Sequence, residues 1–317
     1  MAKISQIIML ALNLIQFCIN FKTVFLKSVI LKLHPKFFNK TRQKRSRPMT
    51  LPLNLVLVRH GESEGNVANR HSRKGDNHFF TAEHLARHSS SWRLTDRGTL
   101  QAKAAGRWLR ENGHGTFERY YSSEYIRAVE TAANLELPNA SWRLEFNIRE
   151  RDHGFADVIR ADERAERFHE YDKQYAAHRF YAPLPEGETM ATLCQRLKSG
   201  FLTQIKEGKP AGSVIAVSHS NVMWALRVIL ERWSARHYHE ASVAEREDEK
   251  INNCQIIEYS RVDPRDSSHI LPSMGWVRSV CPWDLGRSPN EWRAITRPRY
   301  SNSDLIALVN AHERLIA

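Results

Sequence analysis

Two short apolar runs in this 317-residue sequence are each followed by a histidine, and this pattern limits the possible fold more than any other feature. Residues 53–58 (LNLVLV) lead to His60, and residues 213–218 (SVIAVS) lead to His219. Runs rich in branched apolar residues are typical of strands buried in a mainly parallel sheet. Because parallel neighbours end at the same edge of a sheet, we expect both imidazoles at that edge, where open α/β sheets bind ligands.

Helix-like segments alternate with the apolar runs. The sequence therefore predicts an α/β fold, a three-layer αβα sandwich with a mainly parallel central sheet. Thr95 is the expected N-cap of a helix that runs to about Asn112. We expect residues 261–300 to be irregular, because they are rich in Pro, Trp, Ser and Arg. The remaining expected elements are strands at 118–122, 141–147 and 254–259 and helices over 124–135, within 160–180, from 189, over 221–231 and over 304–315.

The net charge of +12 lies almost entirely in the first 48 residues. They hold seven lysines, three arginines and no acidic residue, so residues 49–317 carry a net charge of only about +2. A nearly neutral remainder argues against a nucleic-acid partner. No two cysteines form a CxxC pair and none stands in a zinc-binding pattern, which favours reduced thiols and a cytoplasmic location. The four are Cys18, Cys194, Cys254 and Cys281.

Three interpretations of residues 1–48 stay open. We prefer sequence translated upstream of a start at Met49; a membrane-associated helix over residues 4–31 and a targeting peptide are the alternatives. Membrane contact is expected only if residues 1–48 belong to the native protein. We expect one domain over residues 49–260 and a C-terminal extension over residues 261–317 that packs on it.

Basic and imidazole side chains suited to phosphate chemistry follow the predicted strands. A neutral imidazole such as His60 or His219 can attack phosphorus. Arg59 precedes His60, and Arg127 opens the helix after a Ser-Ser turn. A guanidinium group binds two phosphoryl oxygens at once and keeps its charge. The residues therefore indicate transfer of a phosphoryl group without a metal ion or a nucleotide cofactor.

Six ordered motifs resemble those of the histidine phosphatase superfamily, the clan of cofactor-dependent phosphoglycerate mutases and their phosphatase relatives. The string LVLVRHGESEGN at residues 55–66 resembles the family signature, and the resemblance extends over about residues 53–260. The other segments are LTDRGTLQAKAAGRWL (94–109), YSSEYIRAVETA (121–132), IRERDHG (148–154), LPEGETM (184–190) and VIAVSHSNVMWAL (214–226).

The resemblance implies a role for each matching residue. His60 would be the nucleophile that forms a phosphohistidine, and Glu150 would be the general acid and then the general base. Asp152 and His153 compete with Glu150 for that role. The phosphate pocket would be lined by Arg59, Arg127, His219, Asn66, Ser63 and Ser220. The implied partner is a small phosphorylated substrate, with no metal and no cofactor.

Residues 67–93 depart from the mutase pattern, which has a short Phe-x-Gly-Trp segment at this place. A longer, basic and His-rich stretch stands there, either a lid that binds an anionic part of the substrate or a solvated loop. We reject a metal site in it because no carboxylate or Cys completes a set with the spaced histidines. Its basic residues and histidines include Arg70, His71, Arg73, Lys74, His78, His84 and His88.

Three function classes stay open on this sequence. The missing mutase segment favours a metal-independent phosphomonoester hydrolase that acts through His60. A phosphoglycerate mutase-type phosphotransferase is the first alternative, and a non-catalytic scaffold that binds a phosphorylated ligand is the second.

Overall fold

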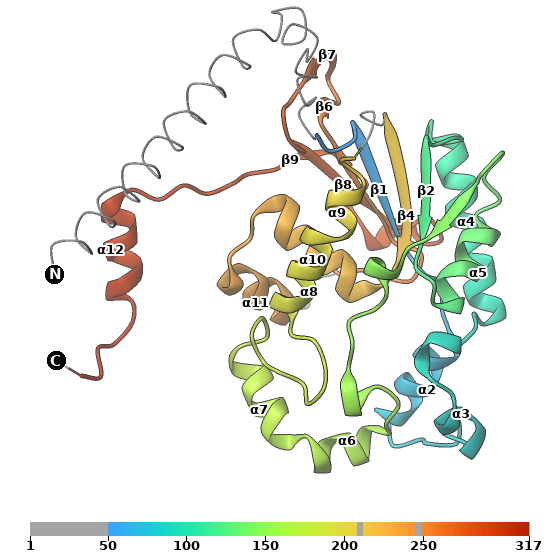
Figure 1. Cartoon of the computed structure of the whole chain (residues 1–317), viewed down its shortest axis with the longest axis vertical. Helices are drawn as coiled ribbons and strands as arrows, with labels where there is room; N and C mark the ends of the chain where they lie inside the picture. The colour runs from blue at the N-terminus through green and yellow to red at the C-terminus, as the bar shows by residue number, and fades with distance from the viewer. Residues whose placement is uncertain (1–49, 208–211, 245–248, 317) are drawn as a thin grey trace, which may run out of the picture. The chain divides into compact units, whose positions relative to one another are not determined.

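The computed structural model describes residues 50–207, 212–244 and 249–316. The expected leader at residues 1–48 lies outside the described residues. A seven-stranded sheet forms the centre of the fold, in the order β3-β2-β4-β1-β5-β8-β9 (Figure 1). Its strands are β1 (Asn54–Arg59), β2 (Arg119–Ser122), β3 (Trp142–Leu144), β4 (Ser213–Ser218), β5 (Ile256–Ser260), β8 (Trp276–Val280) and β9 (Arg293–Ala294).

The first four strands in chain order are parallel, and the last three run antiparallel to their neighbours. The strands expected at 118–122 and 141–147 are β2 and β3, and the mainly parallel character predicted from the apolar runs is confirmed. β5 corresponds to the strand expected at 254–259, although it lies antiparallel beside β1.

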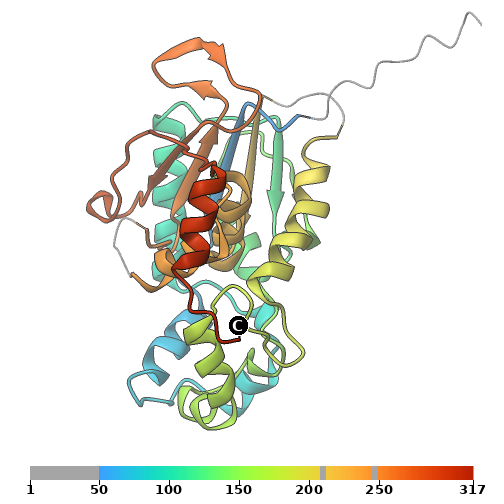
Figure 2. The same ribbon diagram turned by 90° about the vertical axis from the view of Figure 1, so that its left-hand side faces the viewer.

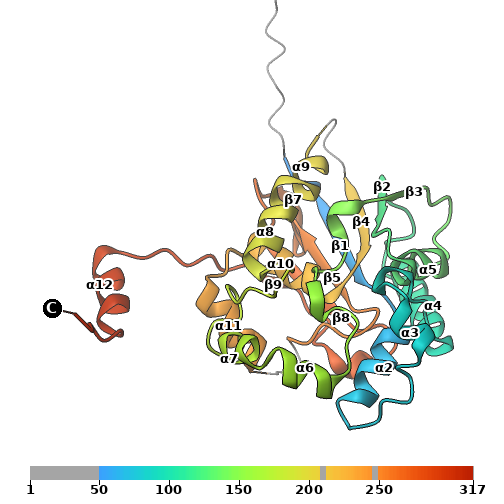
Figure 3. The ribbon, with the colours of Figure 1, turned by 60° about the horizontal axis from the view of Figure 1, so that its bottom comes forward.

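Alternate residues of β1 pack into two separate apolar cores, one on each face of the sheet. Leu55 and Leu57 belong to the core beneath α8 (Met190–Ser199), α9 (Phe201–Gln204) and α10 (Ser220–Glu231). Val56 and Val58 belong to the core beneath α4 (Asp96–Glu111) and α5 (Ile126–Asn134). Figure 3 shows the two helix groups on opposite sides of the strands. The predicted three-layer αβα sandwich is confirmed, because side chains alternate between faces in a strand.

Four helices cover the end of the sheet at which β1 and β4 finish, and Figures 1 and 2 both show them at that end. Thr81 and Ser63 cap the first two of these helices with side-chain oxygens. The charged segment predicted to be helical at 160–180 supplies the other two. The four are α2 (Glu64–Ser72), α3 (Ala82–Ala86), α6 (Ala161–Arg167) and α7 (His169–Ala177), which we call the cap.

Residues 261–300 are only partly irregular, because four strands lie within them, so this expectation was wrong for those strands. They form a small hairpin of β6 (Val262–Asp263) and β7 (Asp266–Ile270), and then β8 and β9 join the main sheet. The boundary expected at residue 260 therefore falls within one sheet, because β8 bonds to β5 along its length. The expected closing helix is α12 (Asn302–Asn310), which buries none of its residues. The remaining helix, α11 (Ala235–Val243), follows α10.

No helix in the described part of the chain is both long enough and apolar enough to cross a membrane. Thr95 caps α4 as predicted, since its Oγ1 accepts the N–H of Gly98 at 3.1 Å. The start of α4 lies directly against the turn after β1. A Cβ at Gly98 would overlap the backbone of Glu62, and a Cβ at Gly61 would overlap the carbonyl of Gly98. Glycine at both positions thus allows the backbone approach that fixes the turn bearing His60.

Gly98→Ala should destabilise the protein, because the added methyl group meets backbone that cannot rotate away. We expect the free energy of unfolding to fall by about 1–3 kcal/mol, measured by urea denaturation. Gly115→Ala is the matched control, since a Cβ there meets open space and the backbone angle is ordinary. Equal stability of the two variants would contradict this account of the turn.

Candidate active site

The candidate active site lies where β1 and β4 end. The backbone N–H of His60 donates to the carbonyl of Ser218 at 2.9 Å, which continues the β1–β4 pairing beyond the strands. His219 follows β4 directly and occupies the position before α10. The two ring centroids are 5.2 Å apart. Register between adjacent parallel strands therefore places the two histidines together, as the sequence predicted.

Hydrogen bonds fix the protonation of the His60 ring. Its Nδ1 lies 2.7 Å from the carbonyl oxygen of Gly61, which can only accept, so Nδ1 carries the proton. The Nε–H of Arg127 donates to Nε2 at 3.2 Å, so Nε2 holds a lone pair. Burial lowers the pKa of His60 well below its usual value, and Arg127 and Arg59 lower it further. The ring is therefore neutral and presents an unprotonated nitrogen.

His219 is fully buried and is held by one hydrogen bond. Its Nε2 lies 2.8 Å from Oγ of Ser123, a residue of the Ser-Ser turn after β2. Its Nδ1 is buried and has no partner among the described residues. Burial lowers the pKa of His219, with Arg127 and His60 as further causes. An orphaned polar nitrogen of this kind fits a site that receives a polar ligand.

The two predicted arginines reach the same place from different elements. Arg59, at the end of β1, donates to the carbonyl of Ile251 at 2.7 Å, while its Nε is buried without a partner. Arg127, in the first turn of α5, donates to the carbonyl of Ser89 at 2.6 Å. Burial is the main cause of the lowered pKa of both groups. Within the described part of the chain, neither guanidinium group forms an ion pair with a carboxylate, so both are suited to an incoming anion.

Glu150 supplies a carboxyl group that favours the protonated form. Burial raises its pKa, against the lowering effects of the Arg151 N–H and of Arg127 and Arg59. Its competitors differ in placement. Asp152 is exposed and does not line the cavity around His60. His153 does line it, but burial and nearby arginines lower its pKa to about 3.

The three remaining predicted residues also border the cavity. Ser63 caps α2, and its N–H donates to Oδ1 of Asn66 at 3.2 Å. Asn66 Oδ1 also accepts from Asn253 at 3.0 Å, which leaves its NH₂ group for another acceptor. Ser220 lies in the first turn of α10, where free backbone N–H groups point toward the end of the helix. These residues therefore offer further donors to an anion.

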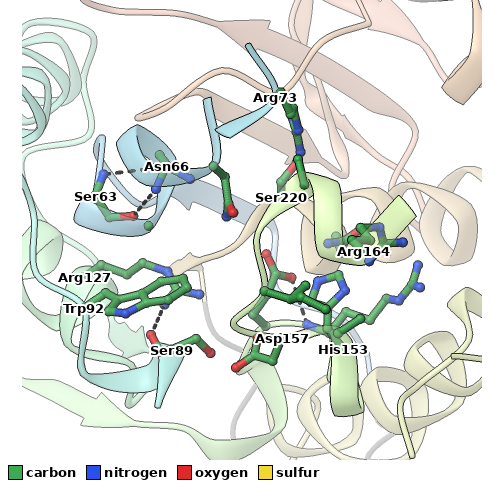
Figure 4. Close-up of a pocket in the computed structure, with 18 of the residues that line it drawn as sticks. Ser63, Asn66, Arg73, Ser89, Trp92, Arg127, His153, Asp157, Arg164 and Ser220 are labelled. Carbon is green, nitrogen blue, oxygen red and sulfur yellow. Dashed lines mark hydrogen bonds between the residues drawn. The ribbon is translucent and has the colours of Figure 1, made fainter. Parts of the chain in front are cut away.

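A cavity of about 410 Å³ is lined by the predicted residues other than His219. The ring of His219 lies beside the cavity, next to the ring of His60. Figure 4 shows Arg127 with Trp92 and Ser89 on one side, and His153 with Arg164 on the other. Several residues that line the cavity were not predicted from the sequence. Those in the cap lie in a charged helical segment that carries no motif. The residues not predicted are Ser89, Trp92, Arg151, Asp157, Arg164, Tyr171, Tyr175 and Asn221.

Residues 67–93 are mostly helical and form one wall of the cavity. Asn69, Arg73, Ser89 and Trp92 line it, so the segment is a wall and not only a solvated loop. The argument used against a metal in this segment was wrong. Asp76 supplies a carboxylate that lies between His71 and His78, because the turn after α2 folds back on the helix.

Comparison with known proteins identifies the family. The family model of the histidine phosphatase superfamily (branch 1) matches residues 55–259 of this chain. The chain belongs to this superfamily. It is 30% identical over 185 residues to a 2,3-bisphosphoglycerate-dependent phosphoglycerate mutase of Methylobacterium radiotolerans, covering 56% of this chain and 78% of the mutase. A mutase of the same description from a Bradyrhizobium species is 28% identical over 186 residues, covering 56% and 81%.

Solved structures with phosphatase descriptions share the fold. A putative α-ribazole-5′-P phosphatase from Escherichia coli superimposes with a TM-score of 0.52 at 18% identity, over 70% of this chain and 97% of the other. A mycobacterial glucosyl-3-phosphoglycerate phosphatase gives a TM-score of 0.52 at 20% identity, over 65% and 92%. The chain is therefore similar in sequence to mutases and similar in fold to proteins described as phosphatases.

The neutral state of the two buried histidines predicts a pH-dependent stability. Their folded-state pKa values are lowered, so below about pH 6.5 the unfolded chain binds more protons than the folded chain. The free energy of unfolding should therefore fall as the pH drops below 6.5, by up to about 1.4 kcal/mol per pH unit for each histidine. Urea denaturation from pH 7.5 to 5 measures this, and His60→Asn should reduce the slope. A slope unchanged in the variant would contradict a neutral His60.

Proposed function

We propose that this chain is a phosphomonoester hydrolase that acts through a phosphohistidine on His60. The observation that supports it most is the unprotonated Nε2 of a buried imidazole, fixed by Gly61 on its other nitrogen and surrounded by cationic groups. A nucleophile of this kind needs no deprotonation before it attacks phosphorus. Membership of the superfamily supports a reaction on phosphate esters in general.

In the first half-reaction, the lone pair of His60 Nε2 gives up its hydrogen bond from the Arg127 Nε–H and forms a bond to phosphorus, while the bond from phosphorus to the leaving oxygen breaks. Arg59 and Arg127 donate to the phosphoryl oxygens and offset the charge that spreads over them. Ser123 Oγ–H can donate to Nε2 of His219, which places the proton on the orphaned Nδ1 and makes it a third donor. Glu150 in its protonated form gives its proton to the leaving oxygen.

In the second half-reaction, water attacks the phosphohistidine. The Glu150 carboxylate takes a proton from this water, so the carboxyl group returns to its starting state. The nitrogen–phosphorus bond breaks and its electron pair returns to Nε2 of His60. Inorganic phosphate then leaves, and the raised pKa of Glu150 makes its carboxylate a stronger base toward this water.

A mutase-type phosphotransferase is the second candidate, and the descriptions of the curated relatives favour it. The same phosphohistidine would then pass its phosphoryl group to a second hydroxyl and not to water. The two functions differ in whether a bisphosphorylated primer is needed. A chain that binds phosphate but turns over neither type of substrate would be a scaffold of the same fold.

His60→Ala should abolish release of p-nitrophenol from p-nitrophenyl phosphate. We expect a loss of at least about 10³-fold in kcat, because loss of a covalent nucleophile removes up to about 10⁶-fold in other enzymes. The assay uses the full chain in EDTA, with His269→Ala on the exposed strand β7 as the control. Activity that appears only with a bisphosphoglycerate primer would instead indicate the mutase, and turnover that survives in His60→Ala would contradict the proposal.

Glu150→Gln tests the proton donor. On an alkyl phosphate we expect kcat/KM, which reports the phosphorylation step alone, to fall by about 10²–10⁴-fold, because the poor leaving group needs a proton. On p-nitrophenyl phosphate the loss in kcat/KM should be much smaller, since nitrophenolate leaves unprotonated. Asp152→Asn is the matched control, because the asparagine oxygen can still accept the Gly154 N–H. Equal losses on both substrates, or a larger effect of Asp152→Asn, would remove Glu150 from this role.

A further inference from the structure

A second cluster of polar side chains lies in the turn that follows α2, on the edge of the cap. Nδ1 of His71 lies 2.8 Å from Oδ2 of Asp76, and Nδ1 of His78 lies 2.6 Å from Oδ1 of the same carboxylate. The three potential ligand atoms all lie within 4.8 Å of one another. No other group of His, Cys, Asp or Glu ligand atoms in the described residues comes together in this way. None of the three residues lines the active-site cavity.

We propose that His71, Asp76 and His78 form a binding site for one Zn²⁺ ion. Two imidazoles and one carboxylate are a ligand set that zinc accepts, with water in the fourth position. Mg²⁺ and Ca²⁺ prefer oxygen ligands and fit this set poorly. The nearest ligand atoms of tetrahedral zinc, bound at about 2.0–2.1 Å, stand roughly 3.4 Å apart. Small rotations of the three partly exposed side chains therefore suffice to admit the ion.

The backbone holds the cluster together before any ion binds. The N–H of Asp76 donates to the carbonyl of His71 at 3.1 Å, and the N–H of Gly75 donates to the carbonyl of Ser72 at 2.9 Å. Gly75 takes the left-handed conformation that this tight return requires, with φ of +84°. These hydrogen bonds bring His71 and Asp76 close together before an ion binds. Binding therefore carries no further loss of chain entropy for closing the turn.

The ring positions are also fixed in part. Phe79 contacts both imidazoles, with ring centroids 3.7 Å from His78 and 4.9 Å from His71. Both rings direct Nδ1 toward Asp76, so the protons of these two hydrogen bonds occupy the space that the ion would take. Each imidazole would bind zinc through Nδ1 in the neutral tautomer that carries its proton on Nε2. Arg73 and Lys74 are exposed, so their repulsion of the cation is screened by salt.

The site would stabilise the cap and take no part in the reaction at His60. Ser72 Oγ donates to Oδ1 of Asn77 at 2.5 Å and accepts the N–H of Ala161, at the start of α6, at 2.8 Å. Asn77 donates in turn to Asp162 at 3.3 Å. Figure 3 shows the end of α2 and α6 at neighbouring places in the cap. An ion would therefore fix the turn after α2, which is hydrogen-bonded to the start of α6, and Arg164 of α6 lines the cavity.

The test is zinc stoichiometry of the full chain, measured by competition with a chromophoric chelator at pH 7.5. We expect one Zn²⁺ per chain in the unaltered protein, in His269→Ala and in His60→Ala, and a loss of that ion in the double variant His71→Ala/His78→Ala. Asp76→Asn should also lose it, although the asparagine can still cap the turn. Because His71, Asp76 and His78 are exposed or half-buried, the variants at these three positions should fold and keep their phosphatase activity.

A second readout does not depend on activity. Zn²⁺ should raise the Tm of the unaltered protein and leave that of the double variant unchanged. Equal zinc stoichiometry in the unaltered protein and the double variant would overturn the proposal. Loss of zinc in His60→Ala alone would also overturn it, because that result would place the ion at the active site. Absence of binding with no Tm shift would show that Asp76 only holds the turn by hydrogen bonds.

Discussion

The pairing of β1 with β4 is the constraint on which the rest of this structure depends. Arg59 lies opposite Ser218 in the register, and the next residue along each strand is a histidine. A shift of one residue would turn the alternating side chains of β1 to the wrong cores. The same register thus determines the two apolar cores and the separation of the two imidazoles. Packing and chemistry are fixed by one set of backbone hydrogen bonds.

The electrostatics of the site follow from the burial of two cationic side chains whose charge no ion-paired carboxylate of the described residues balances. Arg59 and Arg127 have lowered pKa values because they are withdrawn from water, and the nearest carboxyl group, Glu150, is itself held toward its neutral form. Burial of cations without anionic partners is unfavourable. A phosphate ester supplies the missing negative charge, so ligand binding relieves a cost that the folded protein carries. In the proposed reaction, this is also why the arginines stabilise the transferring phosphoryl group effectively.

The parts of the fold that sequence could predict are those encoded locally. The strands ending at His60 and His219 stand out because branched apolar residues are continuous, and Thr95 stands out as a cap. The order of the strands and the antiparallel direction of β5 depend on contacts between distant segments, which periodicity does not report. β8 was not predicted because its Trp and Arg residues are typical of a loop. In the folded chain, Arg278 of β8 forms an ion pair with Glu258 on the neighbouring strand. Arg164 of the cap was missed for the opposite reason, since any charged helix contains such residues.

The division between sheet and cap separates two tasks. Sheet ends and the helices that follow them supply His60, Arg59, His219 and Arg127, so the geometry around phosphorus is set by the most tightly packed part of the molecule. The cap supplies Arg73 and Arg164, which lie on exposed or half-buried helix surfaces around the same cavity. Cap residues can change without disturbing the register of β1 and β4. In the proposed reaction, the part of a substrate beyond its phosphate would contact the region with the fewest structural constraints, and the turn at His71 and His78 lies in that region.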